Sequence, residues 1–286
     1  MGTVCSLTSM RIFVDSIVEL ELHSSVDYGS KREVEMDGQK VIIIRDNGHV
    51  RAFSGVCPHQ GGPLVQGVLG DGIIRCAWHG ACFNSVTGDI ENFPAIDSLV
   101  RFDAQEREGV IRVRARKGLL SSGRRQKHVC EQLDMENKVV VIGGGGAGFS
   151  VVQTLREEGF TGQVTLVSSE SYLPYDRTQL SKGFGWEHRD LVLRDKTWYD
   201  TADIKVMLDK EVDSLDDTTK VVTTKQGDTI EYTHLVLAVG SGPKKLGVPG
   251  EHLEGVTELR SLEDMQNICR KIGGQDAHAH VVVIGS

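Results

Sequence analysis

Two short motifs in the first third of the chain each combine a cysteine with a histidine. Cys57 and His59 flank a proline, and sixteen residues later Cys76 and His79 form the second pair. Two thiolates can bind one iron of a 2Fe-2S cluster while two imidazoles bind the other, and the neutral nitrogen donors raise the potential above that of an all-cysteine cluster. The spacing therefore predicts an iron–sulfur cluster held by these four side chains.

A structural zinc ion is the alternative occupant, because zinc also accepts two cysteines and two histidines. Zinc modules usually pair cysteine with cysteine and histidine with histidine along the chain, whereas each pair here mixes the two types. A third interpretation is that the four residues are buried by chance, but both pairs lie beside glycine-containing loops, 61–64 and 80–83, rather than on an apolar face. These features favour the iron–sulfur cluster.

The sequence around the two pairs, residues 57–69 and 76–95, resembles Rieske domains of the ferredoxin type. In these domains the second loop ends in a Gly-Asp-x-x-x-x-Pro turn, which Gly88, Asp89 and Pro94 match. The resemblance implies a Rieske 2Fe-2S centre that transfers electrons.

High-potential Rieske proteins carry two further cysteines that join the loops by a disulfide. The matching positions here are Gly62 and Trp78. The resemblance therefore implies a low-potential cluster without a loop disulfide, suited to a reducing compartment. Cys82 is misplaced for such a bridge, and we expect a packed or free thiol there.

Short segments with strand character surround these loops, and Asn47-Gly48 is a strong hairpin signal between two of them. Turns about every eight to twelve residues suggest a small antiparallel sandwich or barrel with the cluster loops at one end. The expected strands are 17–22, 41–44, 50–53, 73–75, 99–102 and 110–114.

The domain boundaries follow from these patterns. We expect an N-terminal tail over residues 1–11, a Rieske domain over 12–116 and a linker over 117–136. Residues 121–128 are polar, basic and aperiodic, and we interpret them as a solvated connector.

The periodicity changes in the second half of the chain. A buried-type strand over 138–142 leads into a glycine motif, then into helical spacing up to Gly159 and a second strand over 164–167. A dinucleotide-binding turn requires this order, because its glycines let the backbone approach a pyrophosphate at the helix N-terminus. The glycines concerned are Gly143, Gly145, Gly146 and Gly148.

Glu170 lies 22 residues beyond Gly148, after the second strand. A carboxylate there can accept hydrogen bonds from a ribose 2′-hydroxyl, and an acidic residue rather than an arginine fits an unphosphorylated adenosine ribose. These residues predict a bound dinucleotide and leave open whether it is FAD or NAD.

The run from Leu173 to Lys182 resembles the Pro-Tyr-Asp-Arg-x-x-Leu-Ser-Lys signature of flavoprotein reductases of the apoptosis-inducing-factor and ferredoxin-reductase families. The resemblance implies FAD, with Arg177 beside it and Lys182 near the flavin ring, where a cation could stabilise developing negative charge. No catalytic residue is assigned beyond this placement of Lys182.

The same resemblance extends further along the chain. It implies that Val212 contacts the adenine and that the strand and turn over 235–243 close the FAD domain. Ala238 and Gly240 are therefore also candidate cofactor-binding residues.

Over residues 30–286 the chain resembles the N-terminal part of Rieske-containing apoptosis-inducing-factor-like oxidoreductases. The predicted fold class is multi-domain, an all-β Rieske sandwich followed by an α/β Rossmann-like FAD-binding domain over 137–286 of the pyridine-nucleotide-disulfide-oxidoreductase kind. A strand over 281–284 enters a second glycine turn where this family begins its NAD-binding domain. We therefore expect an incomplete FAD domain and a truncated form.

These features predict an oxidoreductase that passes electrons from NAD(P)H through FAD to a low-potential Rieske 2Fe-2S cluster and on to an acceptor that the sequence does not identify. We do not expect NAD(P)H turnover from the truncated form. The alternative is an apoptosis-related or membrane-associated signalling protein that uses the cofactors structurally or as a redox sensor.

The composition of the chain limits the cellular locations and the classes of partner that we expect for the protein. A net charge of -8 argues against a nucleic-acid partner. There is no transmembrane-length apolar run and no clear presequence, and six cysteines do not make a secreted disulfide framework, so we expect a cytoplasmic or mitochondrial-associated protein. The first residues fit acylation of Gly2, with Cys5 as a second acylation site, which would give peripheral membrane contact; the alternative is an ordinary Met-Gly start.

Overall fold

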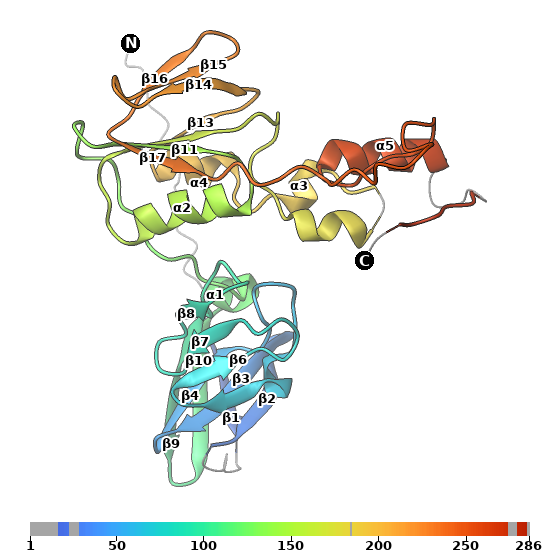
Figure 1. The fold of residues 1–286 in the computed structure, drawn as a ribbon. Helices are drawn as coiled ribbons and strands as arrows, with labels where there is room; N and C mark the ends of the chain where they lie inside the picture. The colour runs from blue at the N-terminus through green and yellow to red at the C-terminus, as the bar shows by residue number, and fades with distance from the viewer. Residues whose placement is uncertain (1–16, 23–28, 184, 274–278, 285–286) are drawn as a thin grey trace, which may run out of the picture. The chain divides into compact units, whose positions relative to one another are not determined.

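The computed structural model describes residues 17–22, 29–183, 185–273 and 279–284. The chain forms two compact units that divide between Lys127 and His128, inside the predicted linker (Figure 1). Gly2 and Cys5, the predicted acylation sites, lie outside the described residues.

The first unit is built on a six-stranded antiparallel sheet in the order β1-β10-β9-β4-β3-β2. Val41 and Ile43 of β3 and Ile111 and Val113 of β10 share one core, to which the edge strands β1 and β2 also contribute apolar side chains. The sheet therefore curves around this core. Its strands are β1 (Ile17–Leu22), β2 (Lys31–Met36), β3 (Gln39–Asp46), β4 (His49–Ser54), β9 (Arg101–Arg107) and β10 (Val110–Arg116).

Tight turns connect neighbouring strands. Asn47 and Gly48 have φ angles of 50° and 76°, the left-handed values that a type I′ turn requires at both central positions. This confirms the predicted hairpin between β3 and β4. The same pair of positive φ angles recurs at Asp37-Gly38, Asp71-Gly72 and Glu108-Gly109.

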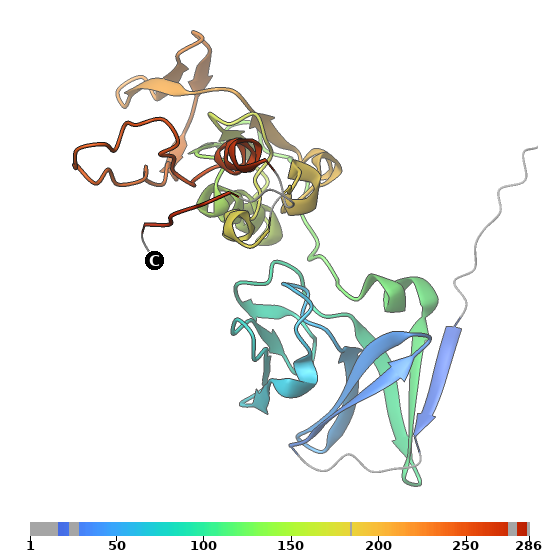
Figure 2. The same ribbon diagram turned by 90° about the vertical axis from the view of Figure 1, so that its right-hand side faces the viewer.

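A four-stranded antiparallel sheet in the order β5-β6-β7-β8 packs against the opposite side of β3 and β4; Figure 2 shows it in cyan beside the large sheet. Ile74 and Phe83 of this small sheet share a buried core with Ile42, Ile44 and Phe53. The two cluster loops leave this core, one after β4 and the other between β6 and β7. The elements are η1 (Leu64–Gln66), β5 (Val68–Gly70), β6 (Ile73–Arg75), β7 (Cys82–Asn84) and β8 (Ile90–Asn92).

The strand predicted over 99–102 is displaced in the structure, where β9 begins at Arg101. Leu99 and Val100 are buried, but the Leu99 N–H donates to the Gly88 carbonyl and the Val100 N–H to the Ser54 hydroxyl. Leu99 and Val100 are therefore buried residues that precede β9, and most of β9 lies after the predicted range 99–102.

The solvated connector predicted over 121–128 is wrong for its first half. Helix α1 (Lys117–Ser122) ends at Gly123, and Arg125 then exchanges two backbone hydrogen bonds of 2.8 Å with Ser98. The Arg125 guanidinium also forms an ion pair with Asp89. Basic side chains that suggest solvent exposure in the sequence instead attach this segment to the first unit.

The second unit contains a parallel sheet in the order β13-β12-β11-β17. Helix α2 packs against β11 and β12 on one side of this sheet, and a three-stranded antiparallel sheet, β14-β15-β16, lies on the other (Figure 1). The elements are β11 (Lys138–Ile142), α2 (Gly146–Glu157), β12 (Gln163–Val167), β13 (Ile204–Met207), β14 (Val212–Asp216), β15 (Val221–Thr224), β16 (Thr229–Glu231) and β17 (His234–Leu237).

Short helices complete the second unit. A capping box between Ser261 and Asp264 starts α5, which packs through Leu262 and Met265 on η2 and α3. Within the described part of the chain, no helix is long and apolar enough to cross a membrane. The helices are η2 (Arg177–Ser181), α3 (His188–Leu191), α4 (Lys196–Thr201) and α5 (Leu262–Ile272).

Candidate cofactor sites

The two cluster loops have matching backbone hydrogen bonds. In each loop the cysteine N–H donates to the carbonyl five residues later, at 2.8 Å from Cys57 and 2.9 Å from Cys76. The N–H groups of Gly61 and Gly80 donate back to the two cysteine carbonyls. These glycines have φ angles of 74° and 79°, which side chains with a Cβ rarely adopt. The sequence thus builds two equivalent turns, each presenting one cysteine and one histidine.

Cys57 and Cys76 lie close together beneath the loops, and both are buried. Burial raises the pKa of the Cys57 thiol to about 12, and the neighbouring Cys76 adds to the rise. Iron binds thiolates, so binding here must release protons from the cysteines.

The imidazoles of His59 and His79 meet edge to face, with ring centroids 4.8 Å apart and planes at 87°. Among the described residues, no group of three or more His, Cys, Asp or Glu side chains that could hold a metal ion is found. A sulfur pair beside a nitrogen pair fits the two irons of a 2Fe-2S cluster better than one tetrahedral zinc. The donor set therefore fits the predicted cluster, and the ligand assignment stays a prediction.

Gly62 and Trp78 stand where the resemblance places the cysteines of a loop disulfide, and they touch each other. A Cβ added at Gly62 would lie 3.0 Å from the indole ring and 3.2 Å from the Cys76 sulfur. Cys82 is a buried free thiol that donates to the Gly80 carbonyl, as expected for a packed cysteine. A glycine–tryptophan contact thus joins the two loops.

The glycine turn between β11 and α2 is crowded on its inner side. A Cβ at Gly148 would lie 1.9 Å from the Gly143 carbonyl oxygen, and a Cβ at Gly143 would lie 2.2 Å from the Ala238 carbonyl oxygen. Gly145 caps α2 without a side-chain hydrogen bond, which leaves amide donors of the first turn for an anion. A Cβ at Gly146 would have no atom within 4 Å. This cradle fits a dinucleotide pyrophosphate.

The structure brings Glu170 and Arg177 together beside this turn. The two form an ion pair, and Glu170 Oε2 also accepts a hydrogen bond from the Tyr175 hydroxyl at 2.8 Å. Arg177 Nε lies 3.9 Å from the place of a Cβ on Gly145. Each carboxylate oxygen accepts more than one hydrogen bond, so Glu170 retains capacity for a ribose hydroxyl.

Arg260 is a site residue that the sequence analysis missed. Its Nη2 would be 3.0 Å from a Cβ on Gly240, and its carbonyl accepts from Arg177 Nη1 at 3.1 Å. The sequence signal that could have indicated Arg260 is the capping box of Ser261 and Asp264. A capping box fixes the start of a helix and therefore also the position of the residue before it. A second guanidinium therefore belongs to this site.

The remaining predicted residues lie on separate elements. Ala238 follows β17, and its N–H donates to the Ile142 carbonyl at 2.8 Å. Val212 begins β14 and packs on the core shared with β11 and β12. Lys182 ends η2 with an exposed side chain that makes no ion pair among the described residues. The flavin-side role of Lys182 stays a prediction.

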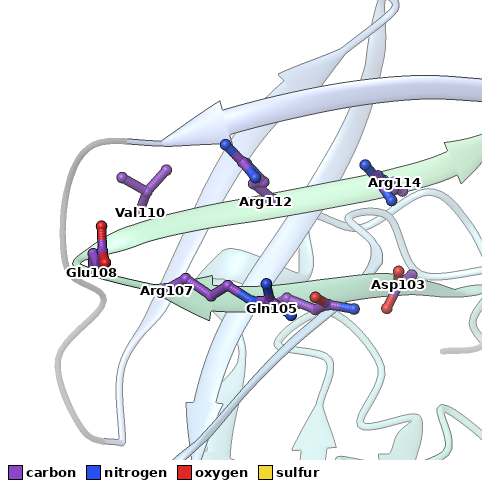
Figure 3. A pocket seen from close by; sticks show the side chains of 7 residues that line it. All are labelled: Asp103, Gln105, Arg107, Glu108, Val110, Arg112 and Arg114. Carbon is purple, nitrogen blue, oxygen red and sulfur yellow. The ribbon is translucent and has the colours of Figure 1, made fainter.

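A hollow of about 450 Å³ lies elsewhere, on the outer face of the β9–β10 hairpin (Figure 3). Arg112 and Arg114 in its lining form ion pairs with Glu21 and Glu19 of β1. No predicted cofactor residue lines it, so it belongs to neither site. It is lined by Asp103, Gln105, Arg107, Glu108, Val110, Arg112 and Arg114.

Two family models match the chain. The model for the Rieske [2Fe-2S] domain matches residues 16–103, and the model for pyridine nucleotide-disulphide oxidoreductases matches residues 137–286. These matches confirm the predicted fold class of an all-β Rieske domain followed by a Rossmann-like region. They also support a 2Fe-2S cluster, FAD and NAD(P)H as the cofactors.

The chain is similar to several known proteins. Apoptosis-inducing factor 3 of Homo sapiens is 39% identical over 267 residues, which are 91% of this chain and 44% of that protein. The ferredoxin–NAD(+) reductase subunit of the benzene 1,2-dioxygenase system of Pseudomonas putida is 40% identical over 134 residues, 46% of this chain and 33% of that one. The covalent putidaredoxin reductase–putidaredoxin complex shows 28% identity and a TM-score of 0.44 over 49% of this chain and 35% of that chain. The chain spans less than half the length of these relatives.

Proposed function

The chain belongs to the pyridine nucleotide-disulphide oxidoreductase family and also carries a Rieske domain, and from this premise we propose that it takes part in electron transfer from NAD(P)H through FAD to a low-potential Rieske 2Fe-2S cluster. The observation that carries the proposal is the presence of both donor sets in one chain: paired thiols with facing imidazoles, and a glycine cradle beside an acidic residue. When bound, FAD supplies the conversion of a hydride into single electrons, and the cluster supplies a one-electron carrier.

In the first unit, the residues would hold and shield the cluster. Cys57 and Cys76 would bind one iron from a buried position that excludes water, and His59 and His79 would bind the other. His79 is exposed, so the imidazole side of the cluster would face solvent and an electron-transfer partner.

In the second unit, the residues would bind and orient the dinucleotide. The first-turn amides of α2 would donate to the pyrophosphate, and Glu170 would accept from the adenosine ribose. Arg177 would balance the nearby negative charge, and Lys182 would stand near the flavin ring, as the family resemblance implies.

Anaerobic expression followed by dithionite reduction tests the cluster. We expect about two irons per chain and the EPR signal of a Cys/His-ligated 2Fe-2S centre. His79→Ala should abolish this signal, while His49→Ala, an exposed histidine on β4, should keep it. A colourless or zinc-containing wild-type protein would refute the cluster.

Titration of the apoprotein with FAD tests the second site. Glu170→Ala should weaken FAD binding roughly tenfold or more, because a charge-assisted hydrogen bond is worth about 1.5–3 kcal/mol. Glu158→Ala changes an exposed glutamate at the end of α2 and should leave FAD affinity unchanged. Equal affinity in Glu170→Ala and wild type would contradict the proposed ribose contact.

We also propose a cytoplasmic or mitochondrial-associated location with peripheral membrane contact through acylated Gly2 and Cys5. Support comes from the acylation pattern and from the cysteines of the described part of the chain, which are all free. The net charge of -8 supports an acceptor other than a nucleic acid. If Gly2→Ala leaves membrane association in cell fractionation unchanged, the acylation proposal fails.

A further inference from the structure

One buried hydroxyl connects the groups that surround the predicted ribose site. The Tyr175 hydroxyl donates to Glu170 Oε2 at 2.8 Å and accepts from Arg177 Nη1 at 2.9 Å and from the Leu262 N–H at 2.9 Å. A phenol oxygen carries one hydrogen and two lone pairs, so these partners use its full capacity. Tyr175 is 2% exposed, so water does not compete for these bonds.

The three partners come from different elements. Glu170 follows β12, Arg177 begins η2 and Leu262 is the first residue of α5. Arg177 Nη1 also donates to the Arg260 carbonyl, immediately before the capping box of α5. The hydroxyl therefore lies where the acidic residue, the η2 guanidinium and the helix start converge.

Packing fixes the ring that carries this hydroxyl. Tyr175 belongs to the same core as Leu180 and Met265, and the ring of His188 meets it edge to face at 6.2 Å. Burial raises the pKa of Tyr175 to about 12, and the hydrogen bond to Glu170 adds to the rise. The phenol thus keeps its proton at neutral pH and remains a donor to the carboxylate.

We infer that Tyr175 is a positioning residue, whose hydroxyl aligns the Glu170 carboxylate and the Arg177 guanidinium for an adenosine-containing dinucleotide and ties both to the start of α5. The identity of the ligand rests on the proposed function. Because both the site and the helix start depend on one hydroxyl, ligand binding should stabilise the start of α5, and a stable α5 should favour binding. Such coupling is reciprocal in free energy.

Tyr175→Phe tests the inference because it removes only the hydroxyl. We expect the affinities for FAD and for ADP to fall by the same factor, about tenfold or ~1.4 kcal/mol, because both ligands carry the adenosine ribose. The matched control is Tyr172→Phe, a partly buried tyrosine packed on the same core and on His188, whose hydroxyl makes no hydrogen bond among the described residues. This control should bind both ligands as the wild type does.

Hydrogen exchange supplies a second measurement. The Leu262 amide should exchange faster in Tyr175→Phe than in wild type, and ADP should slow this exchange in wild type only. Because Tyr175 acts through Glu170 and Arg177, the loss of ADP affinity in the double variant Glu170→Ala/Tyr175→Phe should be smaller than the sum of the two single losses. Circular dichroism confirms that each variant is folded before binding is compared.

Three results would overturn the positioning role: unchanged FAD and ADP affinity in Tyr175→Phe, equal losses in Tyr172→Phe, or a loss for FAD without one for ADP. If the wild type binds neither ligand, the proposed cofactor is wrong. Hydrogen exchange of the ligand-free protein is then the test of the link between Tyr175 and α5. In that case, unchanged exchange at Leu262 in Tyr175→Phe refutes the link to α5, and faster exchange supports it.

Discussion

Two neighbouring glycines at the start of α2 have different structural requirements. Gly148→Ala would place a Cβ 1.9 Å from the Gly143 carbonyl oxygen, whereas Gly146→Ala would place one in open space. We expect Gly148→Ala to lower the free energy of unfolding by about 1–3 kcal/mol or more, as overpacking does. Gly146→Ala should be neutral or stabilise by up to about 1 kcal/mol, because alanine favours helix. Thermal and urea unfolding of the two variants measures the difference, and equal stability would contradict the close approach of Gly148 to the Gly143 carbonyl.

The contact between Gly62 and Trp78 gives a second prediction for a single residue. Gly62→Ala would press a Cβ on the indole ring and on the Cys76 sulfur, so we expect a changed EPR spectrum of the reduced cluster. Gly70→Ala in β5 is the control, because its added Cβ would meet no atom within 4 Å. An unchanged spectrum in Gly62→Ala would show that the sulfur adjusts without disturbing the cluster.

Local sequence motifs indicate most of the candidate residues. The others join the site only through contacts with residues far away in the sequence. Cys57 and Gly143 belong to short patterns whose spacing is visible in the sequence. Tyr175 acquires its role from Leu262, 87 residues away, and Arg260 joins the site through Arg177, 83 residues away. Nothing in a local window relates residues at such separations, so the junction at Tyr175 could be found only in the folded chain.

At the scale of elements, the segment after α1 is attached to the first unit through Arg125. Asp89→Asn should loosen this attachment and speed tryptic cleavage after Arg125, because the guanidinium loses its charged partner. Asp103→Asn is the control, an exposed aspartate on β9 for which no ion pair is seen among the described residues. Mass spectrometry of the early fragments measures the two rates, and equal cleavage in both variants would contradict the attachment.

The same ion pair predicts a dependence of stability on pH. The hydrogen bond from Arg125 lowers the pKa of Asp89. A depressed carboxyl pKa contributes stability above its ordinary value, about 3.9, and this contribution is lost as pH falls through the lower value of the folded state. The ion pair is partly exposed, so we expect Arg125→Gln to lower the free energy of unfolding at pH 7 by only about 0.2–1 kcal/mol. Urea unfolding between pH 7 and pH 2 should show this cost vanish at the acidic end; a constant cost would show that it does not come from the ionised Asp89–Arg125 pair.

Turn chemistry made several elements predictable, while charge misled for others. The φ angles at Asn47-Gly48 follow from residue types that tolerate the left-handed region, and Asp37-Gly38 carries the same signal, which could have located β2. Residues 124 and 125 look like solvated basic residues because their acidic partners Asp97 and Asp89 lie 27 and 36 residues earlier. Charge pattern alone does not distinguish a free cation from one paired across the fold.

At the scale of the whole molecule, each unit has a hydrophobic core of its own, and this arrangement predicts separable responses to core damage. Phe83 is fully buried in the core under the cluster loops, and Phe149 of α2 is buried beside Trp198 of α4. Replacing either phenylalanine by alanine should lower the free energy of unfolding of its own unit by about 3–5 kcal/mol. Calorimetry should then show that the temperature of one unfolding transition is lowered and that of the other is unchanged, and the affected transition should differ between the two variants.

The same two variants should affect different cofactor sites. Phe83→Ala should weaken the cluster EPR signal but leave ADP binding unchanged, and Phe149→Ala should weaken ADP binding but leave the EPR signal unchanged. If both transitions move together in both variants, the two cores unfold as one cooperative unit, and the separation of the two cofactor sites is wrong.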